Sequence, residues 1–523
     1  MTTSGLTSRC ANSLRIISAL LIIFDTAAAW ADVSQEQINN IQSQIESLQK
    51  QLNELKDAQT QKQATTSPAP SAATAPAPAL SATPVSTAAP AAPLKTNDLK
   101  TNDRVKVTVG GFVETAVIDR SKNETTDVGS NFNTGIPFDN SVNAHQSEFR
   151  GTARQSRLSV LAQAKATDTT TLSAYAESDF LGAAPTANST ESNSYNPRLR
   201  VAYATVDQTD SGWHFLAGQS WSLLTTNKTG INPREENVPL VIDAQYVPGF
   251  NWTRNPQIRL TKDFDDHKVW FGISAESPQA SLTQITVPAT VNFTNAGISP
   301  LNTSGSYSTD FAPDVIAKMA FDPGWGHYEV FGVERNFHDN VVASFTNNYT
   351  STFAGGGAAI LPVIDKKLSV QANVMAGQAI GRYGSVQLPD IAFEPNGGIK
   401  PLTGYTALAG VVGHPVSTWD TYIYGGYEGV ERFNTASTTY GYGDYALNNS
   451  GCSVASGSCS AQTAHVWQMA GGFWDRLYEG NYGKMQVGVE DSVSERQAFS
   501  DSNGITPHTY ENILMASFRF YPQ

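Results

Sequence analysis

Strict alternation of apolar and polar residues is the clearest pattern in this chain, and residues 158–182 show it well. One face carries small or apolar side chains, Leu158, Val160, Ala162 and Ala164, then Leu172, Ala174 and Ala176 after a turn at Asp168-Thr169-Thr170. The opposite face is mostly polar and carries Ser159, Gln163 and Lys165, then Tyr175, Glu177 and Asp179. A period of two predicts strands. The apolar face is too light for a soluble sandwich core, which favours a wall between lipid and water.

The same alternation recurs from Arg104 to the C-terminus and predicts about sixteen strands. We place them near 105–118, 150–166, 170–182, 198–207, 212–221, 255–263, 268–276, 313–322, 326–335, 353–362, 367–380, 402–413, 417–428, 464–475, 482–494 and 508–521. The last strand alternates like the terminal strand of outer-membrane barrels, although Pro522-Gln523 follow its final aromatic residue.

The connections between these strands alternate in length. Odd strands are followed by long segments at 119–149, 183–197, 222–254, 277–312, 336–352, 381–401, 429–463 and 495–507. Even strands are followed by short turns at 167–169, 208–211, 264–267, 323–325, 363–366, 414–416 and 476–481. Outer-membrane barrels sort their connections in this way, with short periplasmic turns and long outside loops. We therefore predict an all-β fold, a transmembrane antiparallel barrel of about sixteen strands at 104–523.

Three segments precede the predicted barrel. Residues 1–31 have the form of a secretory signal, with Arg9 and Arg15 before a short apolar core and a small-x-small site at Ala29-Trp30-Ala31. Residues 32–62 predict a periplasmic coiled coil, in which apolar residues occupy the a and d positions: Ile38, Ile41, Ile45, Leu48, Leu52 and Leu55. The alternative is one amphipathic helix packed on its own domain. Residues 63–103 are rich in Pro and Ala and predict an extended linker.

Composition and cysteines narrow the function. A net charge of −13 argues against binding to nucleic acid. Cys10 lies in the signal, which leaves Cys452 and Cys459 as either a disulfide in an oxidising compartment or two free thiols. We find no GxSxG, HExxH or phosphate-binding motif and no metal-ligand spacing, so we expect no enzyme, cofactor or metal site. A Ser/His/Asp set on separate strands stays open.

Arginines on the predicted strands are the candidates for chemistry. The parity of Arg157, Arg198, Arg200 and Arg259 places them on the lumen side. Arg150 and Arg154 share the parity of Leu158, so either a bulge intervenes or they lie above the lipid or at a subunit contact. Inward arginines would orient anions. The alternative is that they only pair with acids: Glu177, Asp179, Glu276 and Glu329.

The third long connection, 222–254, is mixed in charge and partly apolar. We expect it to fold inward and narrow the pore, with a constriction formed by Arg234, Glu235, Glu236 and Asp243.

Six segments carry a resemblance to a known family. They are GGFVETAVID (110–119), TARQSRL (152–158), AYAESDFLG (174–182), RLRVAYA (198–204), FLAGQSWS (215–222) and RNPQIRLT (254–261). With the preceding signal, coiled coil and linker, the chain resembles the DcaP-like trimeric outer-membrane porins, most closely from Val109 to Asp263. The resemblance implies a homotrimer that passes small anionic solutes such as dicarboxylates, and a pore lined by Arg154, Arg157, Arg198, Arg200 and Arg259, to which parity adds Glu177 and Asp179.

We therefore expect a passive porin in the bacterial outer membrane, in contact with lipid and carrying its coiled coil in the periplasm. The alternative is a structural or adhesive barrel, with a lumen plugged by loops and a coiled coil that binds peptidoglycan.

Overall fold

The computed structural model describes residues 98–102, 105–182, 196–296 and 306–522. The predicted signal peptide, the coiled coil and most of the linker lie outside these residues. Within them, no helix has the length and apolar character that crossing a membrane requires.

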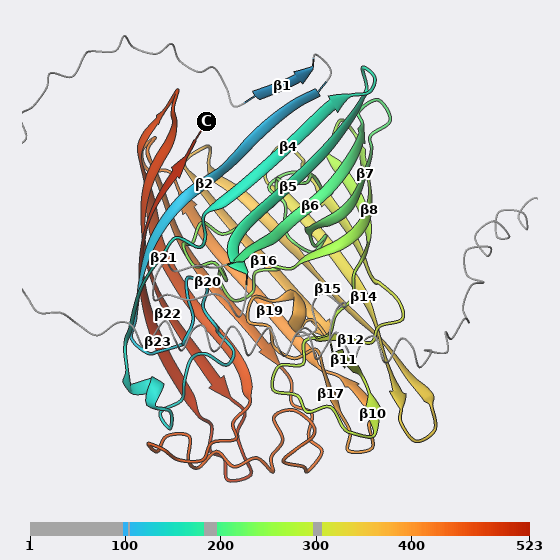
Figure 1. The fold of residues 1–523 in the computed structure, drawn as a ribbon, viewed down its shortest axis with the longest axis vertical. Helices are drawn as coiled ribbons and strands as arrows, with labels where there is room; N and C mark the ends of the chain where they lie inside the picture. Colours follow the sequence, from blue (N-terminus) through green and yellow to red (C-terminus); the bar gives the residue numbers. More distant parts are fainter. Residues whose placement is uncertain (1–97, 103–104, 183–195, 297–305, 523) are drawn as a thin grey trace, which may run out of the picture. The chain divides into compact units, whose positions relative to one another are not determined.

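Sixteen strands close into an antiparallel barrel, as predicted (Figure 1). They are β2 (Val105–Arg120), β3 with β4 (Glu148–Thr152 and Arg157–Lys165), β5 (Thr170–Gly182), β6 (Asn196–Gln208), β7 (Trp213–Trp221), β8 (Arg254–Phe264), β9 (Val269–Glu276), β13 (Asp314–Phe321), β14 (His327–Val341), β15 (Thr346–Ile364), β16 (Leu368–Gln378), β19 (Thr403–Gly413), β20 (Trp419–Val430), β21 (Thr463–Gly480), β22 (Gly483–Ala498) and β23 (His508–Tyr521). Closure is by β23 on β2, where Phe520 pairs with Val113.

Short strands lie outside the wall. β1 (Asp98–Asn102) pairs with the start of β2, and β10 (Val291–Asn292) pairs with the end of β14. Two small hairpins belong to the long loops: β11 (Thr294–Ala296) with β12 (Ser306–Ser308), and β17 (Ile391–Phe393) with β18 (Ile399–Pro401).

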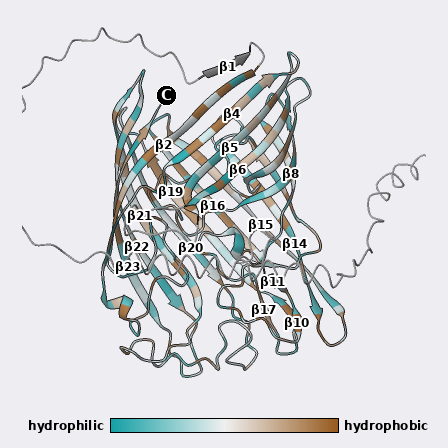
Figure 2. Cartoon of the chain, viewed as in Figure 1, coloured by the Kyte–Doolittle hydropathy of each residue, from teal (hydrophilic) through white to brown (hydrophobic). Residues whose placement is uncertain are grey.

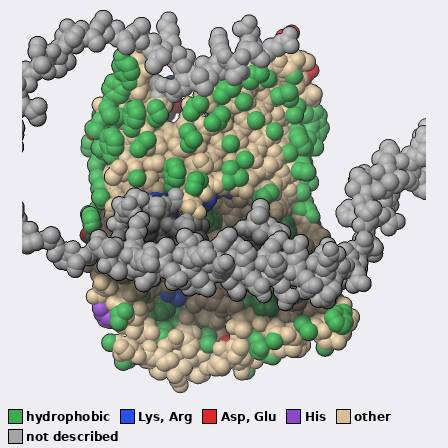
Figure 3. All heavy atoms as spheres, in the orientation of Figure 1, with side chains coloured by type: hydrophobic (Ala, Val, Ile, Leu, Met, Phe, Trp, Pro, Cys, Tyr) green, Lys and Arg blue, Asp and Glu red, His purple; other side chains and the backbone are tan. Residues whose placement is uncertain are grey.

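The barrel is apolar outside and polar inside. Along β2, Val113 is 61% exposed, whereas its neighbour Glu114 is fully buried. The same alternation continues in β8, where Ile258 is exposed and Arg259 is buried. Apolar side chains consequently lie over the outer wall (Figure 3), and hydrophobic and hydrophilic residues alternate along its strands (Figure 2). Such a surface is stable against lipid rather than water.

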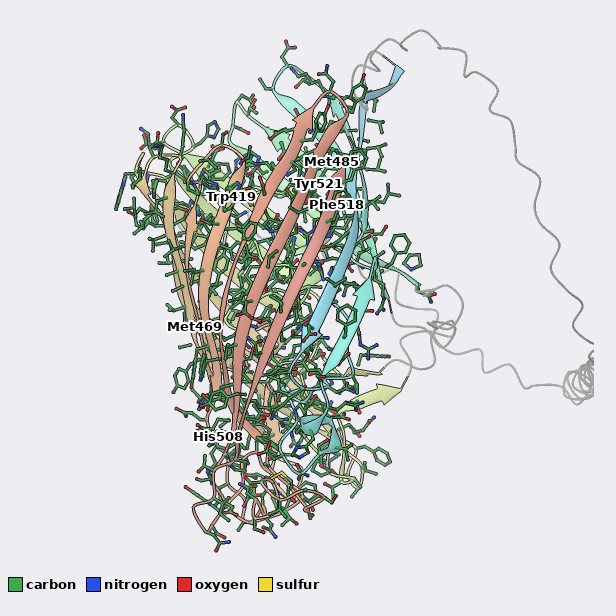
Figure 4. The ribbon with its side chains drawn as sticks, turned by 90° about the vertical axis from the view of Figure 1, so that its left-hand side faces the viewer. Trp419, Met469, Met485, His508, Phe518 and Tyr521 are labelled. Carbon is green, nitrogen blue, oxygen red and sulfur yellow. A yellow bond between two sulfur atoms is a disulfide. The ribbon has the colours of Figure 1, made fainter. Side chains whose placement is uncertain are left out.

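Figure 4 shows one wall from the outside, from Trp419 and Tyr521 near the short turns to His508 near the long loops. Trp419 is exposed and stacks on Phe473 with ring centroids 5.0 Å apart. Of the tryptophans near strand ends, Trp213 and Trp419 are exposed, whereas Trp221, Trp270 and Trp474 are buried. The exposed rings suit a membrane interface, and the buried rings pack in the lumen.

The prediction of loop lengths is wrong at one position. Residues 336–352 do not form a long loop, because β14 and β15 remain paired as far as Val341 and Thr346. Beyond the lipid, outward residues have no need to be apolar, and here they include a hydrogen-bonded pair, Asn340 and Asn347 (2.9 Å). Because the outward residues here are polar, the predicted strands end earlier than β14 and begin later than β15.

A bulge explains the parity of Arg150. Between Thr152 and Arg157 the wall strand is interrupted, and the four residues Ala153–Ser156 lie opposite only three residues of β2, Val113–Thr115. One extra residue reverses the parity of everything before it. Arg150 pairs with Ile118, which is buried on the inner face, so Arg150 lies on that face as well.

The long loops pack against one another at their end of the barrel. One buried apolar cluster brings together residues from four segments of the described chain: Phe132, Val386, Leu388, Ala392, Leu402, Val430, Tyr442 and Val466. In the loop 431–462, Cys452 and Cys459 form a disulfide. The Asn140 backbone joins this loop to the loop 121–147, because its N–H donates to Cys452 O and its carbonyl accepts from Ser456 N.

Replacing Cys452 and Cys459 by serine should loosen this loop without unfolding the barrel. A disulfide that closes so short a ring contributes about 2–3 kcal/mol, mainly by restricting the unfolded chain. We expect the loop 431–462 to be cleaved faster in limited proteolysis, while heat-modifiable gel migration stays unchanged. Equal cleavage rates in the variant and the parent protein would show that the contacts with the loop 121–147 hold the loop alone.

Candidate functional site: a cavity beside the inward loop

The connection between β7 and β8, residues 222–253, is here named the inward loop. Its residues pack in the apolar cluster of the lumen: Val241, Ile242, Tyr246, Val247 and Phe250 against wall residues that include Tyr422, Tyr424 and Trp474. Gly249 has a φ of 86°, and a Cβ there would lie 2.1 Å from the carbonyl oxygen of Ala407. A side chain at this position would clash with the backbone of β19, so only glycine allows the loop to approach this strand so closely.

Four buried glutamates, each on a different strand, accept backbone N–H groups of the inward loop. The pairs are Leu223 N to Glu276 (2.8 Å), Asn227 N to Glu329 (2.8 Å), Gly249 N to Glu428 (2.7 Å) and Ile242 N to Glu490. A loop inside a barrel must satisfy its backbone donors without a neighbouring strand, and these carboxylates supply the acceptors. The wall thus holds the loop at four points around the lumen.

A cavity of about 250 Å³, here named the inner cavity, lies between the inward loop and the wall formed by β4–β7. Its lining includes four basic and two acidic side chains: Arg157, Lys228, Arg200 and Arg234, with Glu177 and Glu236. Tyr175, Tyr203, Trp221 and Tyr246 also line it. The inner cavity therefore combines an excess of positive charge with aromatic rings.

Ion pairs run along the wall in a ladder of alternating charge. Asp179 accepts from Arg198 (2.6 Å) and from Arg200 (3.0 Å). Arg200 also pairs with Glu177, which is 4.0 Å from Arg157. The predicted acidic partners Glu177 and Asp179 are therefore present, whereas Glu276 and Glu329 hold the inward loop instead.

Two arginine donors at this site have no partner among the described residues. They are Nε of Arg157 and Nη1 of Arg254, both of which are buried. Arg254 stacks over Trp221, with 4.8 Å between its guanidinium carbon and the ring centroid. A buried guanidinium N–H without an acceptor is unfavourable.

Two residues of the inward loop have strained backbone at the cavity. The φ angles of Arg234 and Tyr246 are 72° and 67°, in the left-handed region that favours glycine. Strain of this kind is common at functional sites. Burial raises the pKa of Tyr246, but the charges of Arg200, Arg157 and Arg254 outweigh burial and lower the pKa to about 7.

A second cavity, of about 370 Å³ and here named the outer cavity, lies nearer the long loops. Strand direction places it there, because Arg150 and Arg154 precede Arg157, and Arg198 precedes Arg200, on strands that run away from those loops. Three arginines and one acid line it: Arg150, Arg154, Arg198 and Asp127. Arg154 pairs with Asp127 at 2.7 Å.

Three predicted site residues lie elsewhere. Arg259 faces inward but donates to Gln257 and to the carbonyl of Trp221, beneath the surface of the cavity. Asp243 does not line the constriction, because it is buried and accepts from Ser130 N and Oγ at the contact with the loop 121–147. Glu235 is exposed beside Arg234 and does not line the inner cavity.

Sequence reasoning missed Tyr246, Glu428 and Glu490. The two glutamates alternate with apolar residues in predicted strands, a signal that was available from parity. For Tyr246 no such signal exists, because it lies in an irregular loop. Within the part of the chain that the structure describes, no group of three or more His, Cys, Asp or Glu residues is arranged to hold a metal.

Comparison with solved structures identifies the fold. The outer membrane channel DcaP of Acinetobacter baumannii aligns with a TM-score of 0.56 and 18% identity, over 81% of this chain and 99% of that chain. The barrel has the fold of DcaP. The resemblance predicted from the sequence to DcaP-like porins is thereby confirmed for the fold.

More distant alignments are to other outer-membrane proteins. The anion-selective porin from Comamonas acidovorans aligns with a TM-score of 0.43 and 9% identity, over 80% of this chain and 99% of that chain. OmpT of Vibrio cholerae aligns with a TM-score of 0.42 and 10% identity, over 81% and 99%. No model of a known protein family matches this chain, and no curated protein matches it either.

Proposed function

We propose that this protein is a passive porin of the bacterial outer membrane that favours small anions, such as dicarboxylates. The supporting observation is the excess of basic side chains that line both cavities. Each guanidinium offers a planar pair of N–H groups that matches a carboxylate. The predicted pore residues line the path of the anions: those of the outer cavity attract anions, and those of the inner cavity then select among them.

Planar bilayers test this proposal directly. With the full mature protein between two KCl concentrations, the reversal potential should have the sign that chloride permeation produces. A reversal potential of the opposite sign would overturn the anion preference. A folded, heat-modifiable protein without conductance would instead favour the structural barrel, since its long loops already pack together over one end.

Anion preference should fall as the pH rises through 7. Below its pKa of about 7, Tyr246 is a neutral phenol, and above it the phenolate adds a negative charge to the inner cavity. We expect the ratio of chloride to potassium permeability to drop about twofold between pH 6 and pH 8. In Tyr246→Phe the drop should be smaller, because no phenolate can form there, and Glu236, whose pKa is raised by burial, contributes to the drop that remains. The same drop in Tyr246→Phe as in the parent protein would contradict this assignment.

We further propose a homotrimer that is exported by residues 1–31 and held together in part by the heptads of residues 32–62 in the periplasm. The heptad pattern and the Pro/Ala-rich linker support this arrangement. The coiled coil also offers a surface for peptidoglycan, which a pull-down with purified sacculi would test.

Deleting residues 33–62 should leave the conductance of each barrel unchanged and lower the stability of the trimer. The barrel closes on itself without these residues, whereas the heptads supply contacts between chains. The measurements are single-channel conductance and the temperature at which the oligomer dissociates on gels. Loss of conductance in a folded barrel would contradict this division of roles.

A further inference from the structure

The inner cavity differs from the outer cavity in its aromatic lining. Four rings line the inner cavity, Tyr175, Tyr203, Trp221 and Tyr246. The outer cavity has none among its lining residues, although it also carries three arginines. The basic side chains of both cavities favour anions over cations. Only the inner cavity also offers the flat surface of aromatic rings beside its basic side chains.

The rings form two contacting pairs in the lining of the cavity. Tyr175 and Tyr203 project from β5 and β6 with centroids 5.7 Å apart, and Trp221 meets Tyr246 of the inward loop edge-on at 6.2 Å. Arg234 lies over the ring of Tyr175 at 5.7 Å. Aromatic rings and guanidinium groups consequently line the same small volume.

The two kinds of lining group suit two parts of one solute. A carboxylate can accept from the guanidinium groups of Arg157 and Arg234, which line the cavity. A flat ring attached to that carboxylate can pack against tyrosine or tryptophan and can stack on a guanidinium plane. An aliphatic acid of equal charge would gain the ion pair but not the ring contacts.

We infer that the inner cavity selects aryl carboxylates over aliphatic acids of equal charge and similar size. This inference rests on the proposed anion porin and names the solute class that its narrow region favours. The outer cavity collects anions without this discrimination, because its lining lacks rings.

Block of the chloride current by two matched acids tests the inference. Benzoate and cyclohexanecarboxylate have the same charge and carbon count, and only benzoate is flat and aromatic. We expect benzoate to halve the chloride current of the reconstituted protein at about a threefold lower concentration. This comparison needs no variant, so it does not depend on a substitution that might disturb folding.

Variants at Tyr175 then locate the effect. Tyr175→Leu should bring the two half-blocking concentrations together, whereas Tyr175→Phe keeps the ring and should preserve the threefold difference. Tyr482→Leu, in the turn between β21 and β22, is the matched control outside the cavity and should also preserve it. Gel migration and chloride conductance confirm that each variant is folded.

The possible failures are distinguishable. Equal block by both acids in a protein that prefers chloride over potassium overturns the aryl inference and leaves the anion porin standing. A threefold difference that survives in Tyr175→Leu overturns the assignment to the inner cavity. Absence of conductance, or cation preference, overturns the proposed function itself, and with it the inference.

Discussion

Replacing Glu428 by alanine should release one side of the inward loop and raise the single-channel conductance about twofold. The Glu428 carboxylate is 1% exposed and accepts from Gly249 N at 2.7 Å. It also accepts from Val386 N and Ser385 Oγ, both at 3.2 Å, and so joins the inward loop and the loop 379–402 to the same strand. Alanine would leave these donors buried without an acceptor, at a cost of about 1–3 kcal/mol each. The loop should therefore move away from the wall at this point.

Three variants separate release of the loop from general damage. Glu428→Gln keeps a side-chain acceptor and should give a conductance between those of the parent and Glu428→Ala. Glu431→Ala, one residue beyond β20 and bonded to Tyr405, removes a glutamate that does not touch the inward loop, so its conductance should not change. Glu428→Ala/Glu490→Ala removes two of the four anchors and should raise the conductance further. A conductance of Glu428→Ala equal to that of the parent, in a folded barrel, would contradict the anchoring role.

Neutralising Arg157 and Arg234 together should abolish the proposed anion preference. The lining of the inner cavity includes four basic and two acidic side chains, and Arg157→Gln/Arg234→Gln leaves two of each. Balanced charge removes the field that favours anions, so the reversal potential in a KCl gradient should approach zero. Arg200 is left in place because it lies buried between Glu177 and Asp179, and its loss would leave those carboxylates uncompensated.

The control for this pair is Lys366→Gln/Lys367→Gln. These lysines are exposed in the short turn between β15 and β16 and line neither cavity. The same change in net charge there should leave the reversal potential near that of the parent protein. An unchanged anion preference in the arginine variant would show that the inner cavity does not determine the selectivity. The outer cavity would then be the next region to test.

Strand positions were predictable from the sequence because the wall separates two solvents. Each outward residue contacts lipid and each inward residue contacts polar groups, so apolar and polar residues alternate along every strand. The predicted strand 170–182 has the bounds of β5, and the predicted strand 508–521 has those of β23. The exception, 336–352, lies where the outer face no longer meets lipid and polar residues pair as well as apolar ones.

The candidate site was predictable only in part. Parity alone placed Arg157, Arg198 and Arg200 inside, because a strand has only two faces. It failed at Arg150, since one extra residue before Arg157 reverses the faces and leaves no mark in the local sequence.

Only the tertiary structure decided how the inward loop lies. Its backbone donors bind glutamates from β9, β14, β20 and β22, contacts that span up to 248 positions of the chain. Irregular loops have no period, so nothing in residues 222–253 alone tells which wall residues they meet. The sequence by itself determined a barrel and the faces of its strands, because local alternation controls both. The closed barrel decided the cavity, because only closure brings Arg157, Tyr246 and Glu177 around one volume.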